Sequence, residues 1–204
     1  MKPNGMHFPF GPFLWQTKID NDIVNSLLEK TKDTNKYHNH KLAGIIDEEH
    51  KFSDEDTSWF ANKTSNVIKE YLNLGWHYYD QGTDTLKNLK SIHLASLWFN
   101  NMKPGESNPP HSHDGDISFV LYLQVPNEII EENNNFKGRS SGPGKIDFFY
   151  GEFQKAFHST YSFLPLAGEM FIFPANLRHS VNPYKSNVNR ISVSGNYNLV
   201  FNDK

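Results

Sequence analysis

Two stripes of apolar residues in the first third of the chain have the spacing of amphipathic helices. The first stripe consists of Ile23, Val24, Leu27 and Leu28. It follows the N-cap residues Asp20, Asn21 and Asp22, and the pattern predicts a helix over residues 22–31. The second stripe runs from Phe60 to Leu72 and stops near Gly75, a residue typical of helix ends. A short strand is expected before the first helix, over residues 13–19.

The pattern changes at residue 91, where short aromatic and β-branched runs alternate with turn residues. The predicted strands cover residues 91–100, 117–124, 146–150, 169–174 and 190–201. A short helix is expected at 128–132, followed by a loop over 133–145 that is rich in Asn, Gly and Ser. Helices followed by strands predict a mainly β fold, a sandwich or partly closed barrel with helices flanking one face.

Composition supports a single globular domain. A chain of 204 residues with 37% hydrophobic and 14% aromatic residues is long and apolar enough to bury one core. We therefore expect one domain over 1–204, in which residues 1–90 form a helical buttress and residues 91–204 form the strand core.

Several classes of function are excluded or made improbable by composition. The chain has no cysteine, so a metal would be held by nitrogen and oxygen ligands. A net charge of −3 argues against a nucleic-acid partner. The N-terminal residues lack the pattern of a signal peptide, and no apolar run has the length of a membrane span. The expected location is the cytoplasm, of a bacterium or of a phage-infected host cell.

The strongest chemical motif is a His-x-His pair placed directly before the predicted strand at 117–124. Residues two apart in an extended segment point to the same side, so His111 and His113 can present two imidazoles to one metal. Pro109 and Pro110 restrict the chain that leads into the pair. This spacing predicts two ligands of a metal site.

A second motif, residues 168–179, reads as a turn, an apolar strand and a polar corner that carries His179. A distant histidine that returns beside a His-x-His pair would complete a three-ligand facial site with open positions for oxygen or a co-substrate. Eleven positions later, Arg190 begins a core-facing strand. A buried Arg requires an anion, and its planar fork matches a carboxylate.

These residues resemble those of the 2-oxoglutarate- and Fe(II)-dependent oxygenases, specifically the small oxygenases of bacteria and of phages that infect marine cyanobacteria. The resemblance covers about residues 91–196. Its carriers are residues 98–100, 110–113, 116–123, 168–179 and 190–194. The resemblance implies a double-stranded β-helix, iron at one end between two sheets, and 2-oxoglutarate whose far carboxylate pairs with Arg190. It also implies Ser192, Tyr122 and Asn100 as contacts of the co-substrate.

The second iron ligand is where the sequence departs from the family pattern. Most of the wider superfamily has an Asp or Glu at the position of His113, so either His113 completes a three-His site or a nearby carboxylate replaces it. Asp116, beside the start of the strand, is the better acidic candidate, and Asp114 is the other. Aspartates are common in loops whether or not they bind a metal, and this favours the three-His site.

Cupins, which share the barrel, match the same spacing. Gly105 precedes the His-x-His pair as in a cupin, and Gly168, Pro174 and His179 resemble the second cupin motif. Arg190 and the strand at 98–100 favour the oxygenase, because a cupin would not require them. A cupin-type metalloenzyme without 2-oxoglutarate and a non-catalytic ligand-binding barrel remain the alternatives.

The oxygenase resemblance implies oxidation of a substrate by O2, with Fe(II) as the metal and hydroxylation of a C–H bond as the outcome. An amino acid or a protein side chain would fit as the substrate. Loops at the barrel mouth are expected to select it, with residues 133–145 and 151–161 as candidate lids.

Overall fold

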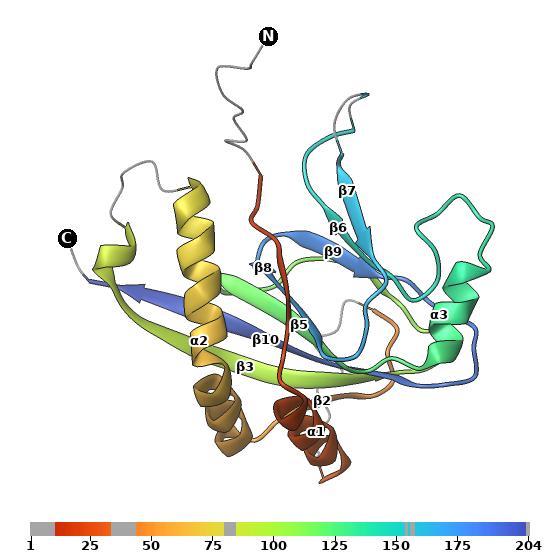
Figure 1. The fold of residues 1–204 in the computed structure, drawn as a ribbon, viewed down its shortest axis with the longest axis horizontal. Helices are drawn as coiled ribbons and strands as arrows, with labels where there is room; N and C mark the ends of the chain where they lie inside the picture. Colours follow the sequence, from red (N-terminus) through yellow and green to blue (C-terminus); the bar gives the residue numbers. More distant parts are fainter. Residues whose placement is uncertain (1–10, 34–43, 80–84, 154, 156–157, 203–204) are drawn as a thin grey trace.

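The computed structural model describes residues 11–33, 44–79, 85–153, 155 and 158–202, which form two β-sheets with helices against one of them (Figure 1). The α-helices are α1 (Asn21–Lys30), α2 (Asp54–Tyr79) and α3 (Asn127–Asn134). The strands are β1 (Trp15–Lys18), β2 (Glu49–Lys51), β3 (Leu89–Met102), β4 (Asn108–His111), β5 (Ile117–Gln124), β6 (Ile146–Phe149), β7 (Thr160–Phe163), β8 (Glu169–Pro174), β9 (Arg178–Val181) and β10 (Arg190–Phe201). Short 3₁₀ turns cover Thr31–Asp33 and Thr85–Asn88.

The strand order identifies a double-stranded β-helix. One sheet has six strands in the order β1-β8-β5-β10-β3-β2, and the other has four in the order β4-β9-β6-β7. From β3 onward the chain passes back and forth between the sheets, since β4, β6, β7 and β9 lie in the smaller sheet and β5, β8 and β10 in the larger. All the pairings are antiparallel. The predicted fold class is confirmed.

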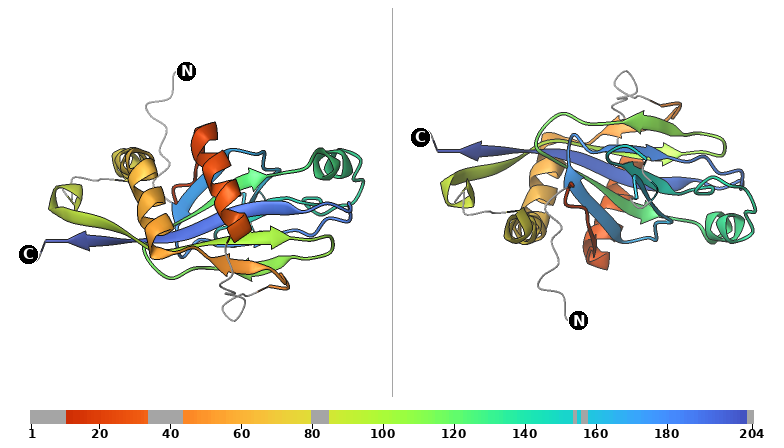
Figure 2. Two further views of the ribbon diagram at one scale, coloured as in Figure 1. Left: turned by 90° about the horizontal axis from the view of Figure 1, so that it is seen from below. Right: turned by 90° about the horizontal axis from the view of Figure 1, so that it is seen from above.

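The six-stranded sheet is covered on both faces, which explains its apolar central strands. Odd-numbered residues of β5, such as Phe119 and Leu121, pack against a core that includes Leu27 of α1 and Phe60 of α2. Even-numbered residues face the four-stranded sheet, where Val120 belongs to a second core. Figure 2 shows the two helices together on the outer face of the larger sheet. A strand buried on both faces reads as a continuous apolar run, as β5 does.

The first 90 residues contribute strands as well as helices. β1 pairs with β8, and β2 pairs with β3, so both extend the larger sheet at its edges. The strand predicted at 13–19 and the helix predicted at 22–31 are found as β1 and α1. The short helix predicted at 128–132 is found as α3.

The predicted end of the second helix at Gly75 is wrong, because α2 continues to Tyr79. The structure suggests a packing reason for the glycine. A Cβ at this position would lie 2.9 Å from Cδ1 of Phe13, whose ring stacks on Tyr71 at 5.2 Å between centroids. Gly75 thus lets the segment before β1 approach the helix closely.

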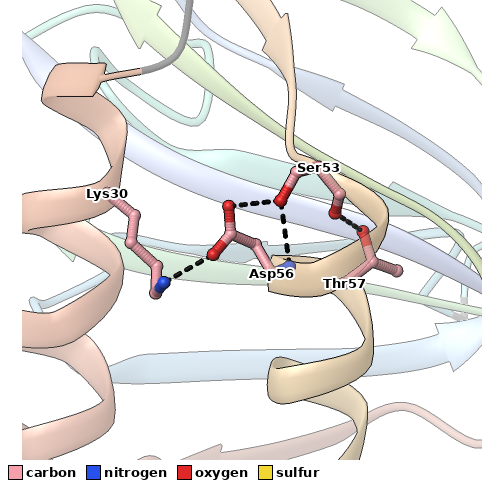
Figure 3. A network of polar contacts seen from close by, with 4 residues as sticks. All are labelled: Lys30, Ser53, Asp56 and Thr57. Atoms are coloured by element: carbon pink, nitrogen blue, oxygen red, sulfur yellow. Dashed lines mark hydrogen bonds and ion pairs between the residues drawn. The ribbon is translucent and has the colours of Figure 1, made fainter.

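A polar network fixes the start of α2 against α1 (Figure 3). The backbone N–H of Asp56 donates to Oγ of Ser53 at 3.0 Å, and this hydroxyl donates to Oδ2 of Asp56 at 2.7 Å. The other oxygen of Asp56 pairs with Nζ of Lys30 on α1 at 2.5 Å. The two helices that support the larger sheet are therefore joined to each other at this end.

Among the residues that the structure describes, no helix combines the length and the apolar character needed to span a lipid bilayer.

Candidate metal centre

The pairing of β4 with β9 brings two of the predicted ligands together. His111 lies opposite His179 in this antiparallel register, and their rings are 4.3 Å apart between centroids. Side chains directly opposite each other in an antiparallel pair share one face of the sheet. Two histidines that are 68 positions apart in the chain therefore become neighbours.

His113 reaches the same point from the segment that carries the chain from β4 to β5. Its backbone N–H donates to the carbonyl of Ala175 at 2.9 Å, and the N–H of Ala175 donates to the carbonyl of Asp116 at 3.0 Å. These bonds join the crossing segment to the turn between β8 and β9. The ring of His113 then lies 5.0 Å from that of His179 and 5.5 Å from that of Trp98.

The three imidazoles form a set that fits one metal ion. One ligand nitrogen from each of His111, His113 and His179 lies within 4.8 Å of the other two. The Nε2 atoms of His113 and His179 are 3.2 Å apart. Two nitrogens bound at right angles to one ion at about 2.1 Å would be roughly 3 Å apart, so this pair already has a chelating separation.

Backbone carbonyls orient two of the three rings. Nδ1 of His111 lies 2.8 Å from the carbonyl oxygen of Pro109, and Nδ1 of His179 lies 3.0 Å from that of Leu177. With Nδ1–H donated to a carbonyl, the lone pair of each ring is at Nε2. Nε2 of His111 also lies 3.4 Å from the amide nitrogen of Asn108, a contact on the ring edge that would face a metal.

The surroundings keep these histidines neutral. Burial, together with charge repulsion from the neighbouring His179 and His111, lowers the pKa of His113 to about 3. Burial likewise lowers the pKa of His179 to about 4 and lowers the pKa of His111. Neutral imidazoles are the form that binds a metal, so the site needs no deprotonation at neutral pH.

The two carboxylates considered as alternatives to His113 lie elsewhere. Oδ2 of Asp116 accepts the backbone N–H of Leu199 at 2.7 Å, which ties it to the far half of β10. Asp114 is exposed in the wall of the adjoining cavity. Among the described residues, the group that could hold a metal contains the three histidines and neither aspartate.

A cavity of about 440 Å³ between the two sheets includes the three histidines in its wall. Its floor is a row of side chains across the larger sheet. Asn100 of β3 is paired with Glu49 on one side and with Ser192 on the other. Ser192 is paired in turn with Tyr122 of β5. The four residues of the row all line the cavity.

Asn100 and Tyr122 in this row have buried polar atoms without a hydrogen-bonding partner among the described residues. They are the side-chain oxygen of Asn100 and the hydroxyl of Tyr122. A buried polar group that is not hydrogen-bonded costs about 1 to 3 kcal/mol. Such groups at the wall of a cavity fit a polar ligand.

Arg190 lies one row deeper, opposite Met102 of β3, and is only 2% exposed. Nη1 donates to the carbonyl of Gly144 at 2.7 Å, and Nη2 lies 2.8 Å from the sulfur of Met102. Its guanidinium carbon lies 5.3 Å from the ring centroid of Tyr122. Within the described part of the chain, no carboxylate forms an ion pair with it, and Nε has no partner. A buried cation without a counter-ion is suited to bind an anion.

Several cavity residues were not predicted from the sequence. Glu49 lies on the three-residue strand β2, and burial raises the pKa of its carboxyl to about 8. Trp98 and Asn108 also line the cavity beside the histidines. The one sequence signal for this wall is the polar alternation of β10, in which Ser192, Ser194 and Asn196 all face the cavity.

The first candidate lid is not a cavity wall. All of residues 133–145 are described, and none of them lines the cavity. Residues 154, 156 and 157 of the second candidate lid lie outside the described residues, and no described residue of 151–161 lines the cavity.

Comparison with protein-family models gives one match, to the family described as "Putative 2OG-Fe(II) oxygenase", over residues 96–196. This stretch begins within β3 and ends within β10, and it contains the three histidines and Arg190. A search of curated proteins gave no match.

Solved structures with a similar fold include a prolyl-4-hydroxylase of Pseudomonas putida, with a TM-score of 0.54 and 15% identity over 94% of this chain and 93% of that one. The collagen prolyl hydroxylase of Paramecium bursaria Chlorella virus-1, in complex with 2-oxoglutarate, has a TM-score of 0.56 and 14% identity over 92% and 96%. HygX of Streptomyces hygroscopicus, with nickel and 2-oxoglutarate bound, has a TM-score of 0.51 and 8% identity over 91% and 82%.

Proposed function

Because the chain belongs to the superfamily of 2-oxoglutarate- and Fe(II)-dependent oxygenases, we propose that His111, His113 and His179 are its three iron ligands. The observation that carries the proposal is the convergence of three neutral imidazoles at a cavity, with Arg190 buried one row beyond the cavity wall and without a carboxylate partner among the described residues. A facial set of three ligands leaves positions open for a chelating co-substrate and for oxygen. The iron site would then contain three histidines and no carboxylate.

The co-substrate would lie between the histidines and Arg190. Its far carboxylate would accept from the guanidinium and from the hydroxyl of Tyr122, which have free donor capacity in the buried end of the site. The hydroxyl of Ser192 and the amide of Asn100 belong to the row that lines the cavity next to Arg190, and they would contact the chain of the co-substrate.

When bound, iron with 2-oxoglutarate and O2 supplies the oxidation, in which 2-oxoglutarate is converted to succinate and CO2 and one oxygen atom enters a C–H bond of the substrate. The protein holds the ligands by the carbonyls of Pro109 and Leu177 and excludes water around them. Phe173 packs 4.8 Å from the ring of His179, and Trp98 packs 5.5 Å from the ring of His113. Both contacts also fix the rotation of the ligand rings.

An amino-acid or peptide side chain is the substrate class that we propose. Two of the solved structures with this fold are named as prolyl hydroxylases. The polar wall formed by Ser96, Ser194 and Asn196 offers hydrogen bonds to an amide or a similar polar group.

The experiment is to measure binding and turnover separately. Fe(II) and then 2-oxoglutarate are titrated into the purified protein without oxygen by calorimetry, and succinate is quantified after air is admitted. We expect His179→Ala to abolish iron binding, and Arg190→Ala to leave iron binding intact while weakening 2-oxoglutarate binding about 100-fold. His93→Ala, which removes an exposed histidine on β3, is the matched control and should bind both normally.

Each alternative function predicts a different result in these titrations. Iron binding by the wild-type protein without any 2-oxoglutarate binding would identify a cupin-type metalloenzyme instead. Absence of iron binding would leave a ligand-binding barrel and overturn the proposal.

A further inference from the structure

The loop that precedes β6 contacts Arg190 through one backbone carbonyl. Gly144 accepts a hydrogen bond from Nη1 of Arg190 at 2.7 Å, so the position of this loop determines where one edge of the guanidinium lies. Gly144 has a φ of +71°, and a Cβ there would meet the side chain of Ile129 at 2.4 Å. The backbone at this position is thus restricted to glycine by conformation and by space.

The rest of the loop is held by side chains from other parts of the chain. Asn182, just after β9, donates to Oγ of Ser141 at 2.6 Å and to the carbonyl of Gly142 at 3.2 Å. The carboxylate of Asp147 on β6 accepts from Ser141 at 2.6 Å and from Asn182 at 3.0 Å. These four residues form one closed polar network.

Two further bonds hold the residues on either side of Gly144. Asn133 at the end of α3 donates to the carbonyl of Pro143 at 2.7 Å. The backbone N–H of Asn182 donates to the carbonyl of Lys145 at 2.9 Å. Every residue from 141 to 145 is therefore held by at least one bond to another element or to Arg190.

We propose that Asn182 and Asp147 are positioning residues for the co-substrate, which act through the 141–145 loop and the Gly144 carbonyl on the guanidinium of Arg190. This inference rests on the proposed function, in that Arg190 binds the far carboxylate of 2-oxoglutarate. Neither residue lines the cavity, and the side-chain hydrogen bonds of both go to the loop and to each other rather than to Arg190, so each would act through the loop. The segment first considered as a lid is instead a fixed support, because a lid would have to break these bonds to move.

If the loop positions Arg190, then loosening the loop should affect some 2-oxo acids and not others. A guanidinium held in one orientation can make two parallel bonds to a carboxylate, whereas a mobile one loses part of this bonding to entropy. Loosening the loop should weaken binding only of acids that reach Arg190. A 2-oxo acid without the far carboxylate, such as 2-oxobutyrate, should be insensitive.

The test compares the dissociation constants of 2-oxoglutarate and 2-oxobutyrate for the Fe(II)-loaded protein without oxygen. We expect Asn182→Ala to weaken 2-oxoglutarate binding about tenfold and to leave the binding of 2-oxobutyrate and of Fe(II) unchanged. Asp147→Asn keeps an acceptor oxygen and the shape of the side chain, so it should retain affinity within about threefold. If Asn182→Ala does not fold, Ser141→Ala removes only the shared hydroxyl and should cost about threefold.

Two controls separate positioning from general damage to the fold. Ser53→Ala removes the cap of α2, far from Arg190 along the chain and in a different network, and should lower stability with no change in either dissociation constant. In an Arg190→Ala background, Asn182→Ala should cause no further loss of 2-oxoglutarate binding, because the two residues act in series.

Equal weakening of both acids by Asn182→Ala, or a full additional loss in the Arg190→Ala background, would overturn the inference. A wild-type protein that binds 2-oxoglutarate no better than 2-oxobutyrate would instead overturn the role of Arg190 in the proposed function. The two failures are therefore distinguishable.

Discussion

At the residue scale, burial keeps the three histidines in the neutral form, and this lowers the stability of the folded protein at acidic pH. In the folded protein the pKa of His113 is lowered to about 3 and that of His179 to about 4, whereas in the unfolded chain a histidine titrates near 6.5. Below pH 6.5 the unfolded chain therefore binds more protons than the folded one, and stability falls.

We predict that the metal-free protein loses stability as the pH is lowered from 6.5 to 4.5, by up to about 1.4 kcal/mol per pH unit for each buried histidine. Urea unfolding at a series of pH values measures this dependence. His113→Gln should reduce the slope, and exposed His93→Gln should not. A slope that is the same in the wild-type protein and His113→Gln would contradict the assignment.

A second residue-scale prediction concerns the hydroxyl of Tyr122, which is buried without a hydrogen-bonding partner among the described residues. Tyr122→Phe removes this desolvated group and keeps the ring beside Arg190, so the free energy of unfolding should rise by about 1 kcal/mol. The same change should weaken 2-oxoglutarate binding, by about threefold to tenfold.

Tyr197→Phe provides the opposite case for comparison. The Tyr197 hydroxyl lies 3.4 Å from Oγ1 of Thr64 in the core beneath α2, so removing it should lower the free energy of unfolding by about 1 kcal/mol. Chemical denaturation of both variants distinguishes them, and destabilisation by Tyr122→Phe would show that its hydroxyl is satisfied in the folded protein.

The spacing of residues in the sequence was sufficient to identify the candidate histidine ligands, but it was not sufficient to exclude the nearby carboxylates as ligands. His111 and His113 were predicted from their separation by two, and the structure places both beside His179. Asp116 remained the alternative to His113 from sequence, because nothing local shows that its carboxylate accepts from the N–H of Leu199. That bond depends on where the end of β10 lies, which is a long-range property of the fold.

At the element scale, α2 shows how tertiary packing overrides a local signal. A helix-interior glycine costs about 1 kcal/mol relative to alanine, which is why Gly75 reads as a helix end. We predict that Gly75→Ala nonetheless lowers the free energy of unfolding by about 1 kcal/mol, since the new Cβ meets the ring of Phe13 at 2.9 Å and displaces it.

Thermal and urea unfolding measure the effect, with Asn73→Ala as the matched control. Asn73 is exposed on the same turn of α2, so alanine there should stabilise the protein by a few tenths of a kcal/mol. A gain in stability from Gly75→Ala would mean that Phe13 is readily displaced and that the glycine has no packing role.

The long strands and the short strands β1 and β6 were predicted from the sequence, whereas the short strands β2, β4, β7 and β9 were not. β5 and β10 have the apolar run or the polar alternation of strands packed on a sheet. β4 contains Pro109 and Pro110, which lack the backbone N–H of a strand residue, and the structure accommodates them because β4 is an edge strand. β2 (EHK) and β9 (RHSV) are short and mainly polar, so they lack the aromatic and β-branched run that identifies a strand.

At the scale of the whole molecule, the site joins the two sheets of the barrel. His111 and His179 belong to the four-stranded sheet, and Arg190 and Tyr122 belong to the six-stranded sheet. A metal bound to the histidines and a co-substrate bound between them and Arg190 would connect the sheets through contacts that the protein alone does not make. Binding of the two ligands should therefore be coupled to the global stability of the fold.

We predict that 2-oxoglutarate raises the melting temperature of the Fe(II)-loaded protein, measured without oxygen. At 100 times its dissociation constant it should add about 2.7 kcal/mol, which is roughly 5 to 10 °C for a chain of this size. The increment should require both sheets: His179→Ala should lose the response to iron and to 2-oxoglutarate, and Arg190→Ala should keep only the response to iron. An equal increment from 2-oxoglutarate in the metal-free protein would contradict this coupling, because the co-substrate would then be held by the six-stranded sheet alone.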